Sequence, residues 1–220
     1  MKKYAKLQKN IDGKEKYSIT PMIPGGYITP DQLIKIGEVA KKYKASVRLT
    51  SAQKITIGNL MKEDIDNIWK DLNMEPAIKD ICSVINIDIC SANFCRRSKY
   101  PIIGLGMKIT KKYHGMELPA KVKIAVAGCK NSCTNAYSKD IGVLPDIDGK
   151  LFIVIGGKSG LKQRKYDLLA DNLNERDVML IIGKLLNYYK INALEGERLS
   201  SFIDRLSIEK IKEDILIKLK

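Results

Sequence analysis

The sequence predicts an α+β fold built from two units, residues 1–78 and residues 79–220. Segments with the two-residue apolar period of strands alternate along the chain with segments that have the helical period. Apolar side chains make up 45% of the 220 residues, which is enough for a sizeable core. No proline- or serine-rich linker separates the halves, so the two units are expected to pack together.

The first unit shows its pattern over residues 16–75. A strand over residues 17–23 is expected to end at a Pro-Gly-Gly turn, after which Thr29 can cap a helix whose first position is Pro30. Short strands over residues 46–49 and 54–57 follow, and then a helix over residues 62–72. This order predicts a ferredoxin-like half-domain, with helices on one side of an antiparallel sheet.

The second unit contains apolar strands over residues 84–89 and 121–127, each leading into a pair of cysteines. The turn sequence Asp-Ile-Asp-Gly at residues 146–149 stands between two β-type runs and predicts a hairpin. An amphipathic helix is expected over residues 175–189, and two further helices over residues 196–206 and 207–219. This unit is therefore also predicted to mix strands and helices.

The charge of the chain is unusual, because 39 Lys and Arg against 25 Asp and Glu give a net charge of +14. Such an excess indicates anionic partners: nucleic acid, a membrane surface, an acidic protein, small anions or a polycarboxylate cofactor. The basic residues are dispersed and form no basic–aromatic stripe, which argues against nucleic acid. The single histidine, His114, argues against a Ser-His-Asp triad and a multi-histidine metal site.

No secretory signal and no membrane-spanning segment are visible in the sequence. Residues 1–10 are lysine-rich with no apolar stretch behind them, and the longest apolar patch, residues 178–186, is interrupted by Lys184 and too short for a bilayer. A cytoplasmic protein is therefore expected. Five cysteines, an odd number, in a reducing cytosol argue against a disulfide framework.

Four of the five cysteines fall into two pairs, Cys90-Ser-Ala-Asn-Phe-Cys95 and Cys129-Lys-Asn-Ser-Cys133. Four thiolates suit either zinc or an iron–sulfur cluster. Structural zinc sites mostly use tighter pairs, so this wider spacing favours a cubane cluster, with zinc and four unrelated buried thiols as the alternatives. Cys82 lies outside both pairs and is expected to be a buried thiol.

The residues around the second pair carry a family resemblance. Gly128-Cys129-Lys130-Asn131-Ser132-Cys133 resembles the Gly-Cys-Pro-Asn-x-Cys signature of the nitrite and sulfite reductases that carry sirohaem and a [4Fe–4S] cluster. Further likeness covers most of residues 16–210 and lies at residues 24–30, 48–53, 90–97, 118–123, 139–142, 156–160 and 196–199. The resemblance implies a ferredoxin-like half-domain over residues 1–78. A sirohaem- and [4Fe–4S]-binding α/β domain with C-terminal helices would follow over residues 79–220.

The resemblance also implies roles for individual residues. In the family, four thiolates hold the cubane and the last also bridges to the sirohaem iron, which gives Cys133 that bridging role here. The ligands of the cluster would then be Cys90, Cys95, Cys129 and Cys133. By the same match, the cations that bind the anionic substrate and supply protons would be Arg48, Lys121 and Lys123. The side chains that clamp the carboxylates of sirohaem would be Arg96, Arg97, Lys54 and Lys130.

Three features depart from the family pattern. The first cysteine pair encloses four residues where the family usually has five, and Ala52 stands where many members have an arginine. Full-length members contain two copies of each unit around a pseudo-two-fold interface, whereas this chain has one. A homodimer is therefore expected to rebuild the site, with thiolates from one subunit and some of the catalytic cations from the other.

The expected reaction is reduction of a small oxyanion, sulfite to sulfide or nitrite to ammonia. No flavin or nicotinamide fingerprint is present, so electrons are expected from a separate ferredoxin or reductase subunit, and an acidic ferredoxin suits the basic surface. The sequence leaves two alternative functions open. One is an electron-transfer or redox-sensing module that keeps the cluster without reductase activity, and the other is a zinc-stabilised nucleic-acid binder.

Overall fold

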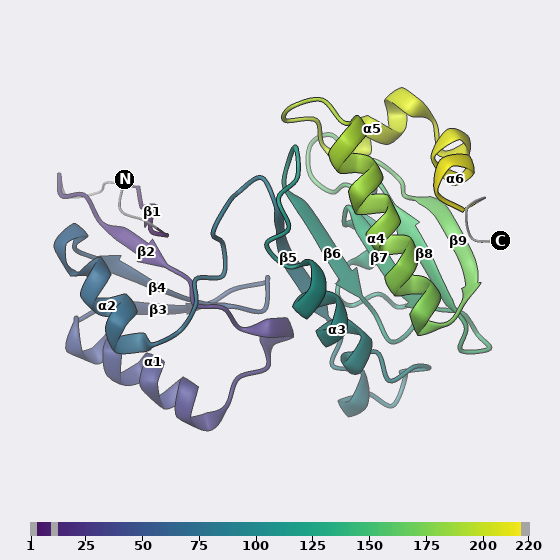
Figure 1. Cartoon of the computed structure of the whole chain (residues 1–220). Coiled ribbons are helices and arrows are strands. Elements are labelled where there is room, and N and C mark those ends of the chain that lie inside the picture. The colour runs from purple at the N-terminus through teal and green to yellow at the C-terminus, as the bar shows by residue number, and fades with distance from the viewer. Residues whose placement is uncertain (1–3, 10–12, 217–220) are drawn as a thin grey trace. The chain divides into compact units, whose positions relative to one another are not determined.

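The computed structural model describes residues 4–9 and 13–216 of the chain. The chain divides into two compact units, Met1–Lys79 and Asp80–Lys220 (Figure 1). Each unit has its own sheet and its own hydrophobic core.

Unit 1 is a four-stranded antiparallel sheet with two helices packed against it. Its strands lie in the order β1-β2-β4-β3 and are β1 (Lys6–Leu7), β2 (Tyr17–Ile19), β3 (Ser46–Leu49) and β4 (Ile55–Leu60). Its helices are α1 (Pro30–Lys42) and α2 (Ile65–Leu72), with short 3-10 turns η1 (Pro24–Gly26) and η2 (Lys62–Asp64) before them.

The predicted start of α1 is confirmed. Thr29 Oγ1 accepts the backbone N–H of Gln32, the Gln32 side chain accepts the N–H of Thr29, and Pro30 occupies the first helical position. Ile36 of α1 and Ile68 of α2 are buried against strand residues such as Ile57. The helices therefore cover one face of the sheet, as a ferredoxin-like half-domain requires.

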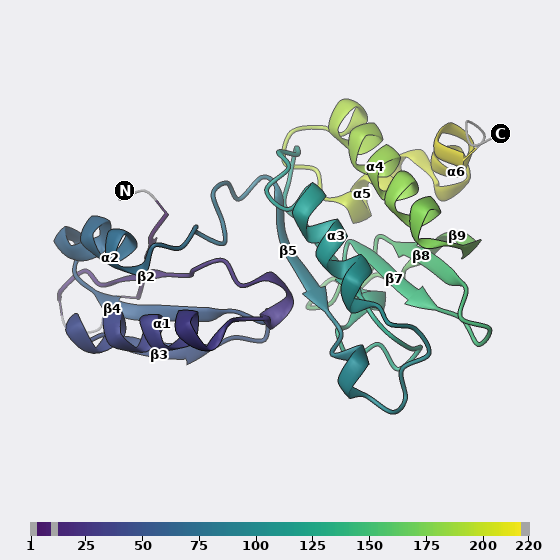
Figure 2. The same ribbon diagram turned by 60° about the horizontal axis from the view of Figure 1, so that its bottom comes forward.

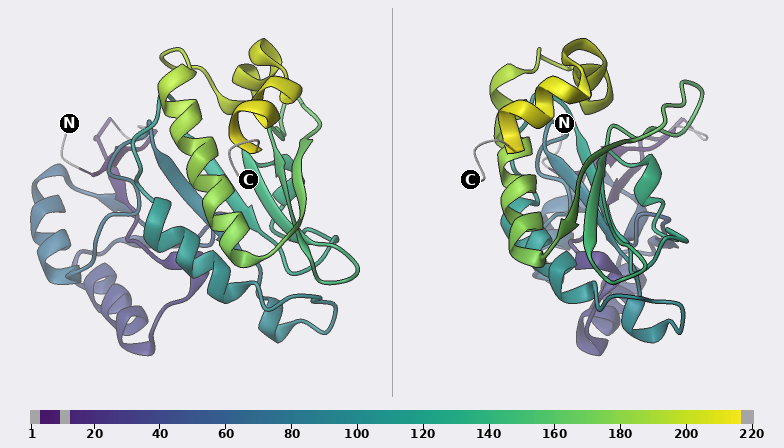
Figure 3. Two further views of the ribbon diagram at one scale, coloured as in Figure 1. Left: turned by 45° about the vertical axis from the view of Figure 1, so that its right-hand side comes forward. Right: turned by 90° about the vertical axis from the view of Figure 1, so that its right-hand side faces the viewer.

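Unit 2 is a five-stranded mixed sheet in the order β5-β6-β7-β8-β9, covered by helices on one side (Figures 2 and 3). Its strands are β5 (Val84–Ile89), β6 (Val122–Val126), β7 (Ile141–Pro145), β8 (Leu151–Ile155) and β9 (Asp167–Leu173). The strands β5, β6 and β7 are parallel, and β7, β8 and β9 are antiparallel. Its helical elements are η3 (Ala92–Phe94), α3 (Ile103–Tyr113), η4 (Ala136–Ser138), α4 (Glu175–Asn192), α5 (Leu199–Leu206) and α6 (Ile208–Leu216).

The two faces of the unit 2 sheet have different characters. Toward the helices, large side chains such as Ile87, Ile124 and Val143 join the main core. On the opposite face a smaller cluster, which includes Ala125 and Ala136, packs under η4. The face away from the α-helices is therefore the one on which polar side chains and loops can gather.

Several elements differ from the sequence prediction. The strands β1 and β9 and the helix α3 were not predicted, and the strand expected over residues 17–23 ends at Ile19. The helix expected over residues 62–72 begins as the 3-10 turn η2. The last helix is α6, and residues 217–219 of that prediction lie outside the described residues. Within residues 4–9 and 13–216, no helix combines the length and apolar character needed to cross a bilayer.

Candidate functional site

The two cysteine pairs begin where two neighbouring parallel strands end. Cys90 follows β5 and its backbone N–H donates to the carbonyl oxygen of Val126, at 2.9 Å, so it continues the ladder beside β6. Gly128 and Cys129 follow β6. The carboxyl ends of adjacent parallel strands meet at one edge of a sheet, which is where α/β folds place their sites.

Contacts of Gly128 bring the two cysteine loops together. The backbone N–H of Lys99, in the loop after Cys95, donates to the carbonyl oxygen of Gly128 at 2.7 Å. A Cβ at position 128 would overlap the Oγ of Ser98 and the Cβ of Ala92. Only glycine lets the first loop approach the start of the second this closely.

The four paired cysteines are all free thiols, and Cys90 interacts electrostatically with each of the other three. Cys90 and Cys129 are half-buried, whereas Cys95 and Cys133 are exposed. Burial raises the pKa of the Cys90 thiol, a backbone hydrogen bond with Gly128 opposes this, and negative charge on Cys129, Cys133 and Cys95 raises it further. The other three thiols therefore lie within electrostatic reach of Cys90.

This donor set fits an iron–sulfur cubane. In a cubane each thiolate binds a different iron, so the four sulfurs stand farther apart than ligands that share one ion. In the described part of the chain, no three or more Cys, His, Asp or Glu side chains are grouped closely enough for a single metal ion. Two converging loops with four free thiols agree with the donor chemistry of a [4Fe–4S] cluster.

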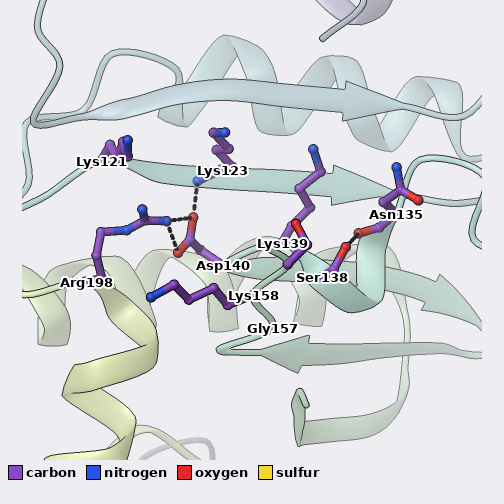
Figure 4. Close-up of a pocket in the computed structure, with 10 residues that line it drawn as sticks. Lys121, Lys123, Asn135, Ser138, Lys139, Asp140, Gly157, Lys158 and Arg198 are labelled. Carbon is purple, nitrogen blue, oxygen red and sulfur yellow. Dashed lines mark hydrogen bonds and ion pairs between the residues drawn. The ribbon is translucent and has the colours of Figure 1, made fainter. Parts of the chain in front are cut away.

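A basic pocket of about 370 Å³ lies in unit 2 (Figure 4). The lining is contributed by β6 and the residue before it, by η4 and its flanking residues, by the segment after β8 and by the residue before α5. The lining residues are Lys121, Lys123, Asn135, Ser138, Lys139, Asp140, Gly157, Lys158, Ser159 and Arg198. Five of these side chains carry a positive charge and one carries a negative charge. The pocket is therefore built to hold anions.

A buried carboxylate organises one side of this pocket. Asp140 accepts the backbone N–H of Lys123 at 2.8 Å and Nη2 of Arg198 at 2.7 and 2.9 Å, as Figure 4 shows. Its side chain is 3% exposed, so the charge depends on these donors. Asp140 thereby ties β6, β7 and the start of α5 together under the lysines.

Burial and neighbouring positive charges both affect the pKa of Lys123. Burial lowers the pKa of its ammonium below the ordinary lysine value, and the positive charges of Lys139, Lys121 and Arg198 lower it further, while Asp140 opposes them. A lysine of lowered pKa releases a proton more readily than an exposed lysine. The group is thus suited both to bind an anion and to donate a proton to it.

The remaining predicted residues lie outside this pocket. In unit 1, Arg48 is exposed on β3 opposite Thr56 of β4, and alternation puts it on the sheet face away from the helices. Lys54, directly before β4, is buried at 8% exposure. In unit 2, Arg96 and Arg97 are exposed just after Cys95, and Lys130 is exposed beside Cys129. These three basic side chains thus flank the cysteine loops.

Cys82 corrects one prediction. It was expected to be buried, but it is exposed in the loop before β5, where its backbone N–H donates to Asp80. Sequence reasoning also gave no role to Lys139, Asp140, Lys158 and Arg198. The only available signal was that they stand in the segments 139–142, 156–160 and 196–199 that carry the family likeness.

A mixed sheet whose neighbouring parallel strands end in cysteine pairs, with a cationic pocket in the same unit, is the arrangement expected of an iron–sulfur oxidoreductase. The nitrite and sulphite reductase 4Fe-4S domain matches residues 82–220, and the nitrite/sulfite reductase ferredoxin-like half domain matches residues 9–75. The chain belongs to the nitrite and sulfite reductase family. The fold and family that the sequence predicts are thereby confirmed.

Relatives and solved structures agree with this membership. An assimilatory-type sulfite reductase of Nitratidesulfovibrio vulgaris is 31% identical over 92% of this chain and 94% of its own length. A nitrite reductase [NAD(P)H] of Bacillus subtilis is also 31% identical, over 94% of this chain but only 26% of its own length. The crystal structure of dissimilatory sulfite reductase I matches the fold with a TM-score of 0.79 at 14% identity, covering 91% of this chain and 69% of that one.

Proposed function

We propose that this chain is a sirohaem- and [4Fe–4S]-dependent reductase that converts sulfite to sulfide or nitrite to ammonia with electrons from an external donor. The observation that carries the proposal is the basic pocket, which gathers Lys121 and Lys123 in the same unit as the four cysteines. Small oxyanions need such cations to offset their desolvation.

The cofactors define what the protein side chains must do. Cys90, Cys95, Cys129 and Cys133 would hold the cluster, and Cys133 would also hold sirohaem. The side chains that would bind the carboxylates of sirohaem are Arg96, Arg97, Lys130 and Lys54. When bound, the two groups supply electrons to the anion. The four free thiols fit the donor set of the cluster. The exposed side chains of Arg96, Arg97 and Lys130 beside them support the carboxylate assignment, whereas Lys54 is buried in unit 1.

Lys121, Lys123 and Arg48 would bind the anion, and the two lysines would also protonate it. Reduction of sulfite to sulfide takes six electrons and six protons and releases three waters, and reduction of nitrite to ammonia takes six electrons and seven protons and releases two waters. The electrons come from the external donor, and the protons pass through the lysines, which are recharged from solvent. Lys123 suits this role because its lowered pKa makes it a better proton donor than an ordinary lysine. Asp140 keeps the segment that carries Lys123 in place by accepting its backbone N–H.

The test is purification under strict anaerobiosis, followed by analysis of iron, zinc and acid-labile sulfide, visible absorbance, and turnover of each anion with reduced methyl viologen. Sirohaem bands together with reduction of sulfite or nitrite support the proposal. A broad cluster absorbance without sirohaem or turnover would instead identify an electron-transfer module. Zinc without iron would overturn the redox function altogether.

We also propose that the active form is a homodimer, because the chain holds one copy of each unit where full-length members hold two. The relative from Nitratidesulfovibrio vulgaris has nearly the same length, so a single copy recurs in the family. Light scattering of the protein with its cofactors bound should give twice the chain mass. A fully active monomer with complete sirohaem occupancy would contradict this part of the proposal.

A further inference from the structure

Lys139 has a partner that distinguishes it from the other lysines of the pocket. Its Nζ lies 2.6 Å from Oδ2 of Asp88, a residue of β5. The Asp88 side chain is 3% exposed and that of Lys139 is 19% exposed. The carboxylate is therefore shielded from solvent, while the ammonium stays at the boundary between the protein interior and the pocket.

The position of Asp88 is fixed by its surroundings. Nδ2 of Asn86, two residues earlier on the same face of β5, donates to Oδ1 of Asp88 at 2.6 Å. One carboxylate oxygen is thus held by an amide and the other by an ammonium. A buried carboxylate is stable only with such partners, so Asp88 holds the Lys139 side chain in one direction.

The backbone of Lys139 is also fixed. It directly follows η4, and its N–H donates to the carbonyl oxygen of Ala136. Gly157 packs against the carbonyl groups of Tyr137 and Lys139 so closely that a Cβ there would overlap the Tyr137 oxygen. Both ends of the Lys139 side chain are therefore placed by the fold.

We propose that Lys139 is a further cationic ligand of the oxyanion, beside Lys121 and Lys123, and that Asp88 is the positioning residue that holds it there. The inference rests on the proposed function, since it concerns the same anion. An ammonium has three N–H donors, so pairing with one carboxylate leaves donors for an anion in the pocket. Figure 4 shows Lys121, Lys123 and Lys139 projecting to the same side of the pocket.

Asp88→Asn distinguishes two explanations, because they predict opposite changes in the affinity for the anion. If only net charge mattered, Asp88→Asn would strengthen anion binding, because a negative charge next to the site is lost. If Asp88 positions Lys139, the same change weakens binding, because the ammonium is no longer held toward the anion. The asparagine is similar in size and can still accept from Asn86, so the fold is expected to survive.

The experiment titrates sulfite and nitrite, separately, into the anaerobically purified protein with its cofactors bound and measures the dissociation constant by calorimetry. Lys139→Gln should weaken binding about tenfold, and Asp88→Asn several-fold, whereas Lys139→Arg should retain most of the affinity. The matched controls are Lys112→Gln on α3 and Asp148→Asn in the β7–β8 hairpin. Both are exposed, lie outside the pocket lining and should leave the affinity unchanged.

A double-mutant cycle completes the test. If Asp88 acts through Lys139, Asp88→Asn has no further effect in the Lys139→Gln background. Tighter or unchanged binding by Asp88→Asn, or full additivity of the two changes, overturns the positioning role. Unchanged binding by Lys139→Gln overturns the whole inference.

The same titrations separate this inference from the proposed function. If Lys121→Gln and Lys123→Gln weaken binding while Lys139→Gln does not, only the role of Lys139 fails. If none of the three changes matters, the pocket is not the anion site and the proposed function fails with it. Urea unfolding of each variant checks that the fold is intact.

Discussion

Lys123 shows how one residue gains reactivity from its neighbours. Its backbone is fixed by Asp140, and its side chain stands among other cations in a partly buried pocket. The protein thus keeps an ammonium where burial and repulsion both favour loss of its proton. Because its pKa is lowered, Lys123 can bind the anion while it is charged and then donate a proton to it.

The pH dependence of anion binding tests this account. Because the pKa of Lys123 is lowered, it becomes neutral at a lower pH than an ordinary lysine, so anion affinity should begin to fall at that lower pH. In Lys123→Arg the guanidinium stays charged, and the fall should move to higher pH. Nitrite is the suitable probe, because it stays a monoanion over the alkaline range. An unchanged alkaline limb in Lys123→Arg would assign the dependence to another group.

The sequence predicted some of these residues and missed others for a physical reason. Lys121 and Lys123 alternate with apolar residues, so their shared face could be inferred from the strand period. The pairing of Lys139 with Asp88 could not, because it joins β5 to the segment after η4 across 51 residues of chain. Likewise, the exposure of Cys82 depends on a loop that no local pattern defines.

At the level of elements, the 3-10 turn η4 fixes the pocket because it packs directly on the sheet. The backbone of Ala136 lies so close to Gly142 of β7 that a Cβ at position 142 would overlap its carbonyl oxygen. The same turn leads into Lys139 and Asp140. The absence of a side chain at Gly142 therefore lets η4, and the charged residues that follow it, lie close to the sheet.

A substitution at Gly142 tests this packing. Gly142→Ala should destabilise the protein by about 2 kcal/mol, because the added methyl group must displace backbone or Val154, and it should also weaken nitrite binding. The matched control is Gly104→Ala on α3, where nothing lies within 4 Å of the added Cβ. That change should stabilise by about 0.5–1 kcal/mol and leave binding unchanged. Urea unfolding midpoints give both values, and equal stability of the two variants would contradict the packing argument.

The helix α3 explains a failure of the sequence prediction at this scale. Gly104 and Gly106 lower the helix propensity of the segment and hide its apolar period. In the structure Gly106 packs against β5, since a Cβ there would overlap the side chain of Ile89. Gly106, which lowers the helix propensity of the segment, is thus also the residue that lets α3 pack against β5. By contrast, α1 was predictable because Thr29 and Pro30 mark its start locally.

For the whole molecule, the dominant physical property is the charge of +14. The pocket accounts for five cations, so most of the excess lies elsewhere on the chain. A long-range positive field of this kind speeds the approach of an acidic partner and weakens as salt screens it. The proposed function needs such a partner, because the electrons come from outside the chain.

Reduction by an acidic ferredoxin should therefore depend strongly on salt. Raising the ionic strength from about 0.01 M to about 0.3 M shortens the screening length from about 30 Å to below 10 Å, so the rate at limiting ferredoxin should fall by about tenfold or more. The rate at saturating ferredoxin should change little, because screening acts on encounter. Reduced methyl viologen, a cation repelled by the protein, is the control and should react no more slowly at high salt. A rate of reduction by ferredoxin that does not change with salt would mean that the donor is recognised by short-range contacts. The positive charge would then act on the cofactor and the anion only.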